Sequence, residues 1–139
     1  MVTRETARGS RAVSASAWLL MSLVLFAGPG CRTAEEKHLE ASLALYSQAL
    51  EVIESNAANP NEGLAALAKL EEDSRGQRSA TRAEFVAALE KLDEPQRKAF
   101  NDEAKTRSDP LRAKLDAATK RYPEDRRPRI RQLLNQLLR

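Results

Sequence analysis

A row of apolar residues spaced alternately by four and three positions constrains the fold of this chain most. This spacing places all members of the row on one face of an α-helix, because three to four residues make one turn. Leu45, Ala49 and Val52 widen that face to the breadth expected of a helix in a bundle. We therefore predict a helix over about residues 34–57 whose apolar face must be covered by other helices. The members of the row are Leu39, Leu43, Tyr46, Leu50, Ile53 and Ala57.

A second helix is predicted to begin at Pro60. Asn59 can cap it with its side chain, and proline suits the first helical position. Glu62 can reach back to the capping residue, as in a capping box. The apolar face of this helix comprises Leu64, Leu67, Leu70, Phe85, Leu89 and Leu92.

Polar residues interrupt this second apolar face at Glu71, Ser74, Arg78 and Thr81. Two interpretations remain open. One is a long helix over residues 60–92 with a polar middle, and the other is a break near residues 74–79 followed by a restart that Thr81 caps. We favour one helix, because the apolar positions keep the same phase on both sides of the interruption.

A third helix is predicted after Asp93, which can cap it while Gln96 closes a capping box. Pro110 stands within its apolar face without changing the phase, so we expect a kink or a one-residue stop there. The face comprises Phe100, Ala104, Leu111, Leu115, Ala118 and Tyr122.

The last segment, residues 128–138, is predicted to form a short amphipathic helix. Its apolar side consists of Ile130, Leu133, Leu134, Leu137 and Leu138. No segment shows the two-residue period of a strand, and residue types that favour helices predominate. The expected fold class is therefore all-α: an antiparallel three- to four-helix bundle with short loops over residues 34–139.

The chain before this domain has the organisation of an export signal. Three arginines precede residues 18–26, which are apolar apart from Ser22, and glycine and proline break the apolar run at residues 28–30. A basic segment, a short apolar core and small residues, in that order, mark a targeting sequence rather than part of the fold. The only cysteine of the chain, Cys31, follows directly.

The motif at residues 28–31 resembles the lipobox of bacterial lipoprotein signal peptides. Gly30 and Cys31 match that pattern, whereas Gly28 stands where leucine is usual and Pro29 is uncommon there. The resemblance implies that residues 1–30 are a cleaved signal peptide and that Cys31 becomes an N-terminus acylated with fatty acids such as palmitate. Residues 31–33 would then form a short tether. A lone thiol in an oxidising compartment also favours such a modification.

This interpretation places the protein on the bacterial cell membrane or outer membrane. The lipid on Cys31 would hold it there, with the helical domain facing the periplasm or the exterior. Two alternatives remain. Residues 12–30 carry no charge and could span a membrane as an uncleaved signal anchor, or the protein could be secreted without a lipid.

The charge distribution bears on the partners of the protein. Three of the 23 basic residues and one of the 20 acidic residues precede Cys31, so the remainder is nearly neutral. This balance gives no reason to expect nucleic acid as a partner. Arg126, Arg127, Arg129 and Arg131 make the C-terminal segment basic, which would suit a secondary contact with anionic lipids. We expect this helix to pack onto the bundle first, with its arginines facing water or the acidic helices.

The sequence shows no constellation typical of an enzyme, and we expect no catalytic residue, cofactor or metal ion. Glu35 and His38 have the spacing of a carboxylate–histidine metal pair, but the chain has no second histidine to complete a di-metal site. The acidic residues 71–73 are interpreted as part of a solvated helix face. Neither a G-x-S-x-G elbow nor a glycine-rich phosphate loop occurs.

Two short segments resemble parts of known helical families. Residues 44–50 look like the second helix of a tetratricopeptide unit, which would imply an interaction module. Residues 92–96 are similar to the L-T-x-x-Q signature of periplasmic chaperones and metal-stress proteins, with Asp93 in place of threonine. Helix capping alone also accounts for this second string.

The predicted function is the binding of a protein partner by a lipid-anchored helical bundle of the cell envelope. The alternative is a chaperone- or stress-type module that binds unfolded chains. An exposed concave apolar face around Phe85, Phe100 and Tyr122 would favour that alternative, whereas a closed core would favour the first function.

Overall fold

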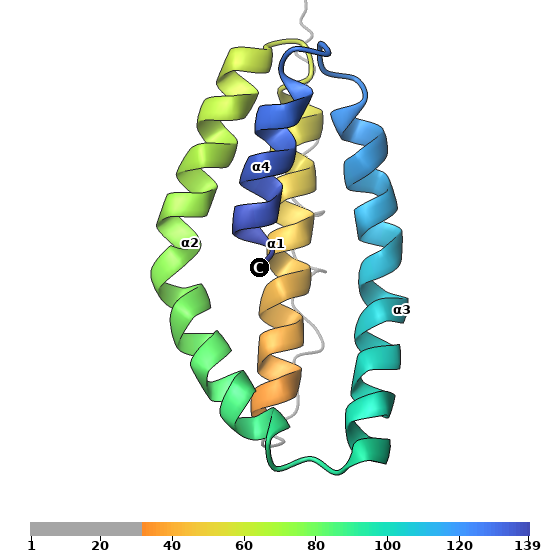
Figure 1. The fold of residues 1–139 in the computed structure, drawn as a ribbon. Helices are drawn as coiled ribbons and strands as arrows, with labels where there is room; N and C mark the ends of the chain where they lie inside the picture. The colour runs from red at the N-terminus through yellow and green to blue at the C-terminus, as the bar shows by residue number, and fades with distance from the viewer. Residues whose placement is uncertain (1–31) are drawn as a thin grey trace, which may run out of the picture. The chain divides into compact units, whose positions relative to one another are not determined.

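The computed structural model describes residues 32–139, so Cys31 and the predicted signal peptide lie outside the described residues. The described part is entirely helical, with four helices and no strand: α1 (Ala34–Ser55), α2 (Pro60–Leu89), α3 (Glu94–Thr119) and α4 (Arg127–Leu137). Successive helices run in opposite directions, which gives an up-down-up-down bundle (Figure 1). The predicted all-α bundle is confirmed, with four helices.

The fourth helix is much shorter than the others and divides the bundle into two ends. Helix α1 packs against α2 and α3, while α4 packs chiefly on α2. Figure 1 shows that α4 begins beside the loop that joins α1 to α2 and ends at mid-height. We call the half of the bundle that contains α4 and the loop joining α1 to α2 the four-helix end. The three-helix end holds the start of α1 and the loop that joins α2 to α3.

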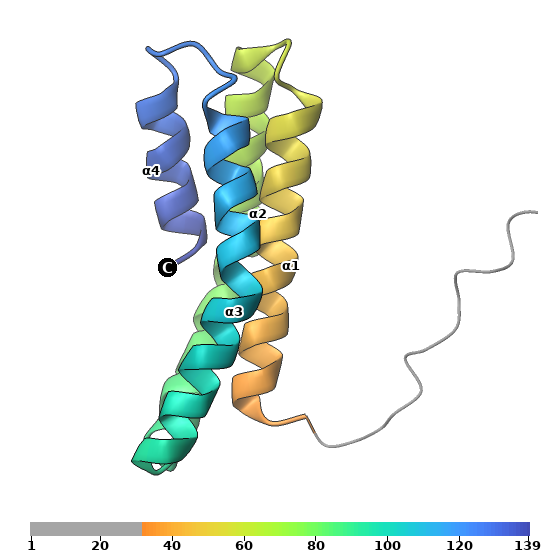
Figure 2. The same ribbon diagram turned by 90° about the vertical axis from the view of Figure 1, so that its right-hand side faces the viewer.

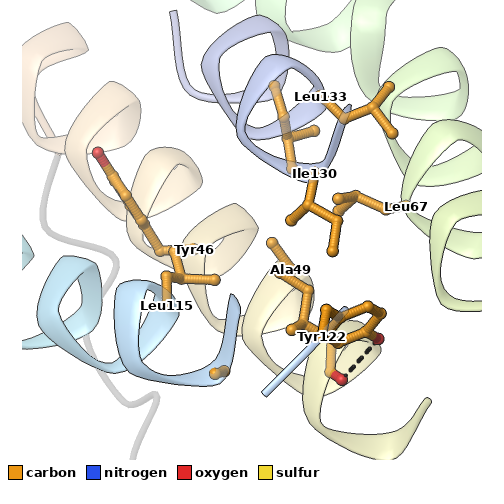
Figure 3. Close-up of a cluster of buried hydrophobic side chains, with 10 residues drawn as sticks. Tyr46, Ala49, Leu67, Leu115, Tyr122, Ile130 and Leu133 are labelled. Carbon is orange, nitrogen blue, oxygen red and sulfur yellow. Dashed lines mark hydrogen bonds between the residues drawn. The ribbon is translucent and has the colours of Figure 1, made fainter. Parts of the chain in front are cut away.

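The hydrophobic core lies at the four-helix end (Figure 3). Burial of each large apolar side chain contributes about 1.5–3 kcal/mol to stability, so this end carries most of the packing energy. The predicted seam of α1 needs one correction. Leu50 and Ala57 are only half-buried, whereas Ala49 is completely buried, because α1 faces two helices and not a single partner. The core comprises Tyr46, Ala49, Ile53, Leu67, Leu115, Ala118, Tyr122, Ile130, Leu133 and Leu137.

Capping boxes begin two of the helices. The Asp93 side chain accepts a hydrogen bond from the Gln96 backbone at 2.8 Å, and the Gln96 side chain accepts one from the Asp93 backbone at 3.0 Å, as predicted. Thr33 makes the same arrangement with Glu36 at the start of α1. The prediction for Asn59 was wrong, because its side chain makes no capping bond and the first turn relies on the proline at position 60.

The favoured prediction of one continuous second helix is confirmed, and of the two outcomes expected at Pro110 the structure shows no stop. Helix α2 runs unbroken through residues 74–79, and Thr81 lies within it with its hydroxyl bonded to the backbone oxygens of Gln77 and Arg78. Pro110 does not stop α3. Figure 2 shows that the axis of α3 changes direction along its length, in agreement with the predicted kink. A bend is the usual response to the hydrogen bond that an interior proline removes.

Candidate functional site

A cavity of about 430 Å³ lies between α1, α2 and the C-terminal end of α4. We call it the arginine cavity, because three arginines of α2 line it. Polar residues of α1 and α2 line it as well. The arginines give this lining a net positive charge. Its polar lining includes His38, Ser42, Arg75, Arg78, Ser79 and Arg82.

A buried carboxylate, paired with two arginines, forms the base of the cavity. Glu71 is only 8% exposed, and its two carboxylate oxygens accept bonds from Arg75 at 2.8 Å and from Arg78 at 3.0 Å. The hydrogen bond from Arg75 holds the pKa of Glu71 below its usual value, with further support from Arg78 and against the effect of burial. Because both oxygens are occupied, this carboxylate serves as a structural counter-ion.

The burial of Glu71 corrects the prediction that residues 71–73 all belong to a solvated face. Glu71 lies one turn after the fully buried Leu67, so it sits on the inner face of α2. Glu72 and Asp73 point outward and are exposed, as predicted. The polar middle of α2 is therefore an organised network rather than a stretch of solvated side chains.

Two arginines of the cavity also donate to backbone oxygens at the end of α4 and just beyond it. Arg78 donates from Nη1 to the carbonyl oxygen of Gln136, and Arg82 donates from Nη1 to that of Arg139. The last carbonyls of a helix lack partners within the helix and carry partial negative charge. The cations of α2 therefore help to hold α4 in place, and the cavity lies just beyond this contact.

His38 closes the side of the cavity toward the three-helix end. Its ring stacks on Phe85 with 4.2 Å between centroids, and Phe85 contacts Phe100 at 5.5 Å. Burial lowers the pKa of His38 below its ordinary value, and the nearby Arg82 lowers it further. The Nδ1 atom of His38 is buried and has no hydrogen-bond partner among residues 32–139.

The metal pair considered for Glu35 and His38 receives no support from the arrangement of the side chains. The His38 ring is engaged with Phe85, and no hydrogen bond joins it to Glu35 within the described chain. Among residues 32–139, no group of three or more His, Cys, Asp or Glu side chains is placed to hold a metal ion.

The three aromatic residues named for a concave binding face do not come together. Tyr122 is 1% exposed and lies in the core at the four-helix end. Phe85 and Phe100 are half-buried at the three-helix end, where they pack against each other. The described bundle therefore has a closed core around Tyr122 and a separate aromatic pair.

The basic C-terminal residues are largely engaged within the protein. Arg127 donates to the carbonyl oxygens of Tyr122 and Lys120 at 2.8 and 2.9 Å, so it caps the end of α3. Arg126 pairs with the adjacent Asp125, and Arg129 donates to the side chain of Gln132. Arg131 makes no close ion pair within residues 32–139, but it adds to the effect of Lys120 in lowering the pKa of Asp116. The apolar side of α4 is buried in the core through Ile130, Leu133 and Leu137.

The predicted lipidation site, Cys31, precedes the first described residue. The described chain starts at Arg32, immediately before the capping residue Thr33. Among the described helices, none combines the length and apolar character that a membrane span requires.

Comparisons with protein-family models, with curated proteins and with solved structures find no match to this chain. Sequence reasoning missed the arginine cavity as a site, although a signal for its base was present. Glu71, Arg75 and Arg78 recur at intervals of four and three, which places a carboxylate and two guanidinium groups on one helix face.

Proposed function

We propose that the protein is a lipoprotein of the bacterial cell envelope whose helical bundle acts by binding a protein partner. In this proposal residues 1–30 are removed and Cys31 carries the lipid. The cell membrane or the outer membrane then holds the domain in the periplasm or outside the cell. The tetratricopeptide-like interpretation of residues 44–50 is one form of the same binding function.

The start of the bundle is the observation that carries this proposal. The capping box of Thr33 and Glu36 begins α1 two residues after Cys31. A lipid on Cys31 would therefore be joined almost directly to an ordered helix, without a long flexible linker. A helix of 22 residues is about 33 Å long, so an upright bundle would project its four-helix end by that distance.

This geometry bears on the proposed secondary membrane contact through Arg126, Arg127, Arg129 and Arg131. These residues lie at or near the start of α4, at the four-helix end. Arg32 precedes the first residue of α1, which lies at the three-helix end. In an upright orientation they would be out of reach of the membrane that holds the lipid. We therefore favour the four-helix end as a surface for a partner.

The closed core supports a binding surface in preference to a chaperone groove. Tyr122, which an open groove would have to expose, is buried and hydrogen-bonded. The half-buried pair of Phe85 and Phe100 is the surface that a chaperone-type module would use instead. If this second candidate function is correct, binding of an unfolded chain should slow hydrogen exchange of the backbone amides at the three-helix end.

Metabolic labelling with a clickable fatty acid tests the lipoprotein proposal. The wild-type protein should take up the label, and mass spectrometry should find a mature chain that begins at acylated Cys31. Cys31→Ser should take up no label. Equal labelling of both proteins, or an N-terminus other than residue 31, would refute the proposal.

The partner proposal needs a separate experiment. A photo-crosslinking residue placed at exposed Arg121, at the four-helix end, should capture a defined envelope protein in living cells. The matched control is the same residue at exposed Lys98, near the three-helix end. Capture from position 98 alone would favour the aromatic end, and capture from neither position would contradict a stable protein partner.

A further inference from the structure

We propose that the arginine cavity binds a small organic anion, in which a phosphate or carboxylate group is attached to an apolar part. The volume of about 430 Å³ falls within the range of roughly 300–1,000 Å³ that small-molecule sites occupy. This inference concerns the cavity alone and does not depend on the lipid anchor.

The charges that line the cavity favour an anion. Arg75, Arg78 and Arg82 all contribute to the lining, together with Arg139, while Glu71 is its only carboxylate side chain. Both oxygens of Glu71 are already bonded to Arg75 and Arg78. The lining therefore keeps a surplus of positive charge that the described side chains do not neutralise.

Three residues that line the cavity keep hydrogen-bond donors that no group of the described chain uses. Arg82 donates only from Nη1, which leaves Nε and Nη2 without an acceptor among residues 32–139. The hydroxyls of Ser42 and Ser79 line the cavity and likewise make no hydrogen bond within the described chain. A guanidinium group and hydroxyl groups in one lining suit the oxygen atoms of a phosphate or carboxylate.

The role of the arginines in capping α4 does not account for these donors. All three nitrogens of Arg78 donate: Nε to Ser74, Nη2 to Glu71 and Nη1 to the carbonyl oxygen of Gln136. Arg82 is only partly engaged by the end of α4, and neither serine contacts α4 through a hydrogen bond. The contacts with α4 and Glu71 thus account for Arg78, but not for the unused donors of Arg82, Ser42 and Ser79.

The remaining wall of the cavity is apolar. Ala41 and Leu45 of α1 face it from one side, and Leu138 lines it next to the end of α4. A ligand that fills the space would bury an apolar part against these residues while its charged group meets Arg82. Phenyl phosphate and benzoate are simple probes, because each joins one charged group to one apolar ring.

Titration of the full-length protein in a neutral detergent tests the proposal. His38 is the only histidine of the chain, so the Hε1 proton of its imidazole gives a single assignable NMR signal at the edge of the cavity. Phenyl phosphate or benzoate should shift this signal saturably. Benzyl alcohol, which has the ring but no charge, should not. The anion with the lower dissociation constant identifies the preferred charged group. The difference in affinity between phenyl phosphate and inorganic phosphate measures the contribution of the ring.

Two variants locate the bound anion. Arg82→Gln should weaken binding at least tenfold, because it removes the free donors and one positive charge. Arg121→Gln is the matched control, because Arg121 is exposed and its side chain makes no hydrogen bond or ion pair within residues 32–139. Ser42→Leu should abolish binding by filling the cavity, and circular dichroism should show that each variant remains folded.

Three results would overturn the proposal. The first is the absence of a saturable shift at His38 with either organic anion. The second is an equal loss of affinity in Arg82→Gln and Arg121→Gln, which would indicate only a general attraction of anions to a basic surface. The third is unchanged binding in a folded Ser42→Leu variant.

Discussion

The side chain of Tyr122 lies directly over Gly63, where a Cβ atom would collide with the phenolic oxygen. The same hydroxyl donates a hydrogen bond of 2.8 Å to the carbonyl oxygen of Ile53 (Figure 3). That carbonyl belongs to the last turn of α1, where carbonyl groups have no N–H donor within the helix. One tyrosine thus joins the end of α3 to the end of α1 and the beginning of α2.

Gly63→Ala should destabilise the bundle. The new methyl group would displace the Tyr122 hydroxyl and leave the buried Ile53 carbonyl without its donor. Overpacking of this kind costs about 1–3 kcal/mol, so the melting temperature followed by circular dichroism should fall. A melting temperature equal to or above that of the wild type would contradict the close contact.

Gly76→Ala should have the opposite effect and serves as the matched substitution. Gly76 also lies within α2, but a Cβ there would meet no neighbouring atom. Alanine is favoured over glycine in a helix interior by about 0.8–1 kcal/mol. The melting temperature should therefore rise, and a decrease would mean that the middle of α2 is not a regular helix.

Ile53→Ala should cost more than Leu50→Ala, although both positions belong to the predicted row of α1. Ile53 is 1% exposed in the core, whereas Leu50 is half-buried at its margin. Loss of a fully buried isoleucine side chain costs about 2–5 kcal/mol, and the loss at Leu50 should be smaller. Urea denaturation of the two variants measures the difference, and a reversed order would place the core on the other face of α1.

Local signals account for the parts of the fold that could be predicted from the sequence. The capping box at Asp93 involves residues three positions apart, and the burial of Tyr46 and Ile53 follows from helical spacing. Each is decided within one or two turns of one helix. The preserved phase of α2 likewise outweighed the glycine and polar residues in its middle.

Contacts between distant segments could not be predicted in this way. The contact of Gly63 with Tyr122 and the bonds from Arg78 and Arg82 to α4 join residues more than 50 positions apart. They depend on how the helices are rotated against one another, which apolar spacing leaves open. The arginine cavity arises because α4 ends at mid-height, and the sequence marks only where that helix begins and ends.

The stability of the protein should depend on the protonation of His38. Its pKa in the folded state is lowered by burial and by Arg82, relative to 6.5 in the unfolded chain. Well above pH 6.5 both states are neutral, and this contribution to stability is fully present. As the pH falls below 6.5, the unfolded state binds the proton more readily, so stability decreases until the folded state is also protonated.

Urea midpoints measured between pH 7.5 and 5.5 test this dependence. The wild type should lose stability across that range, and His38→Gln should lose less, because glutamine does not titrate. The comparison concerns the slope with pH, since the substitution also removes the contact with Phe85. Equal slopes in the two proteins would show that His38 is as accessible to protons in the folded state as in the unfolded chain.

Removal of α4 should lower the stability of the domain more than any single substitution considered above. Ile130, Leu133 and Leu137 are each at most 3% exposed, and each buried side chain of this size contributes about 1.5–3 kcal/mol. Deletion of residues 127–139 also exposes the apolar surface of α2 on which α4 packs. The melting temperature of the truncated chain should therefore fall sharply, or its cooperative transition should disappear.

The charges of α4 can be tested apart from its packing. Arg129→Gln with Arg131→Gln leaves the apolar side intact and removes two exposed cations that make no close ion pair within residues 32–139. Its stability should stay within about 0.5 kcal/mol of the wild type. If α4 instead served mainly as a lipid contact, truncation would leave the melting temperature unchanged. The double variant would then bind anionic vesicles less tightly than the wild type, with a difference that disappears at high salt.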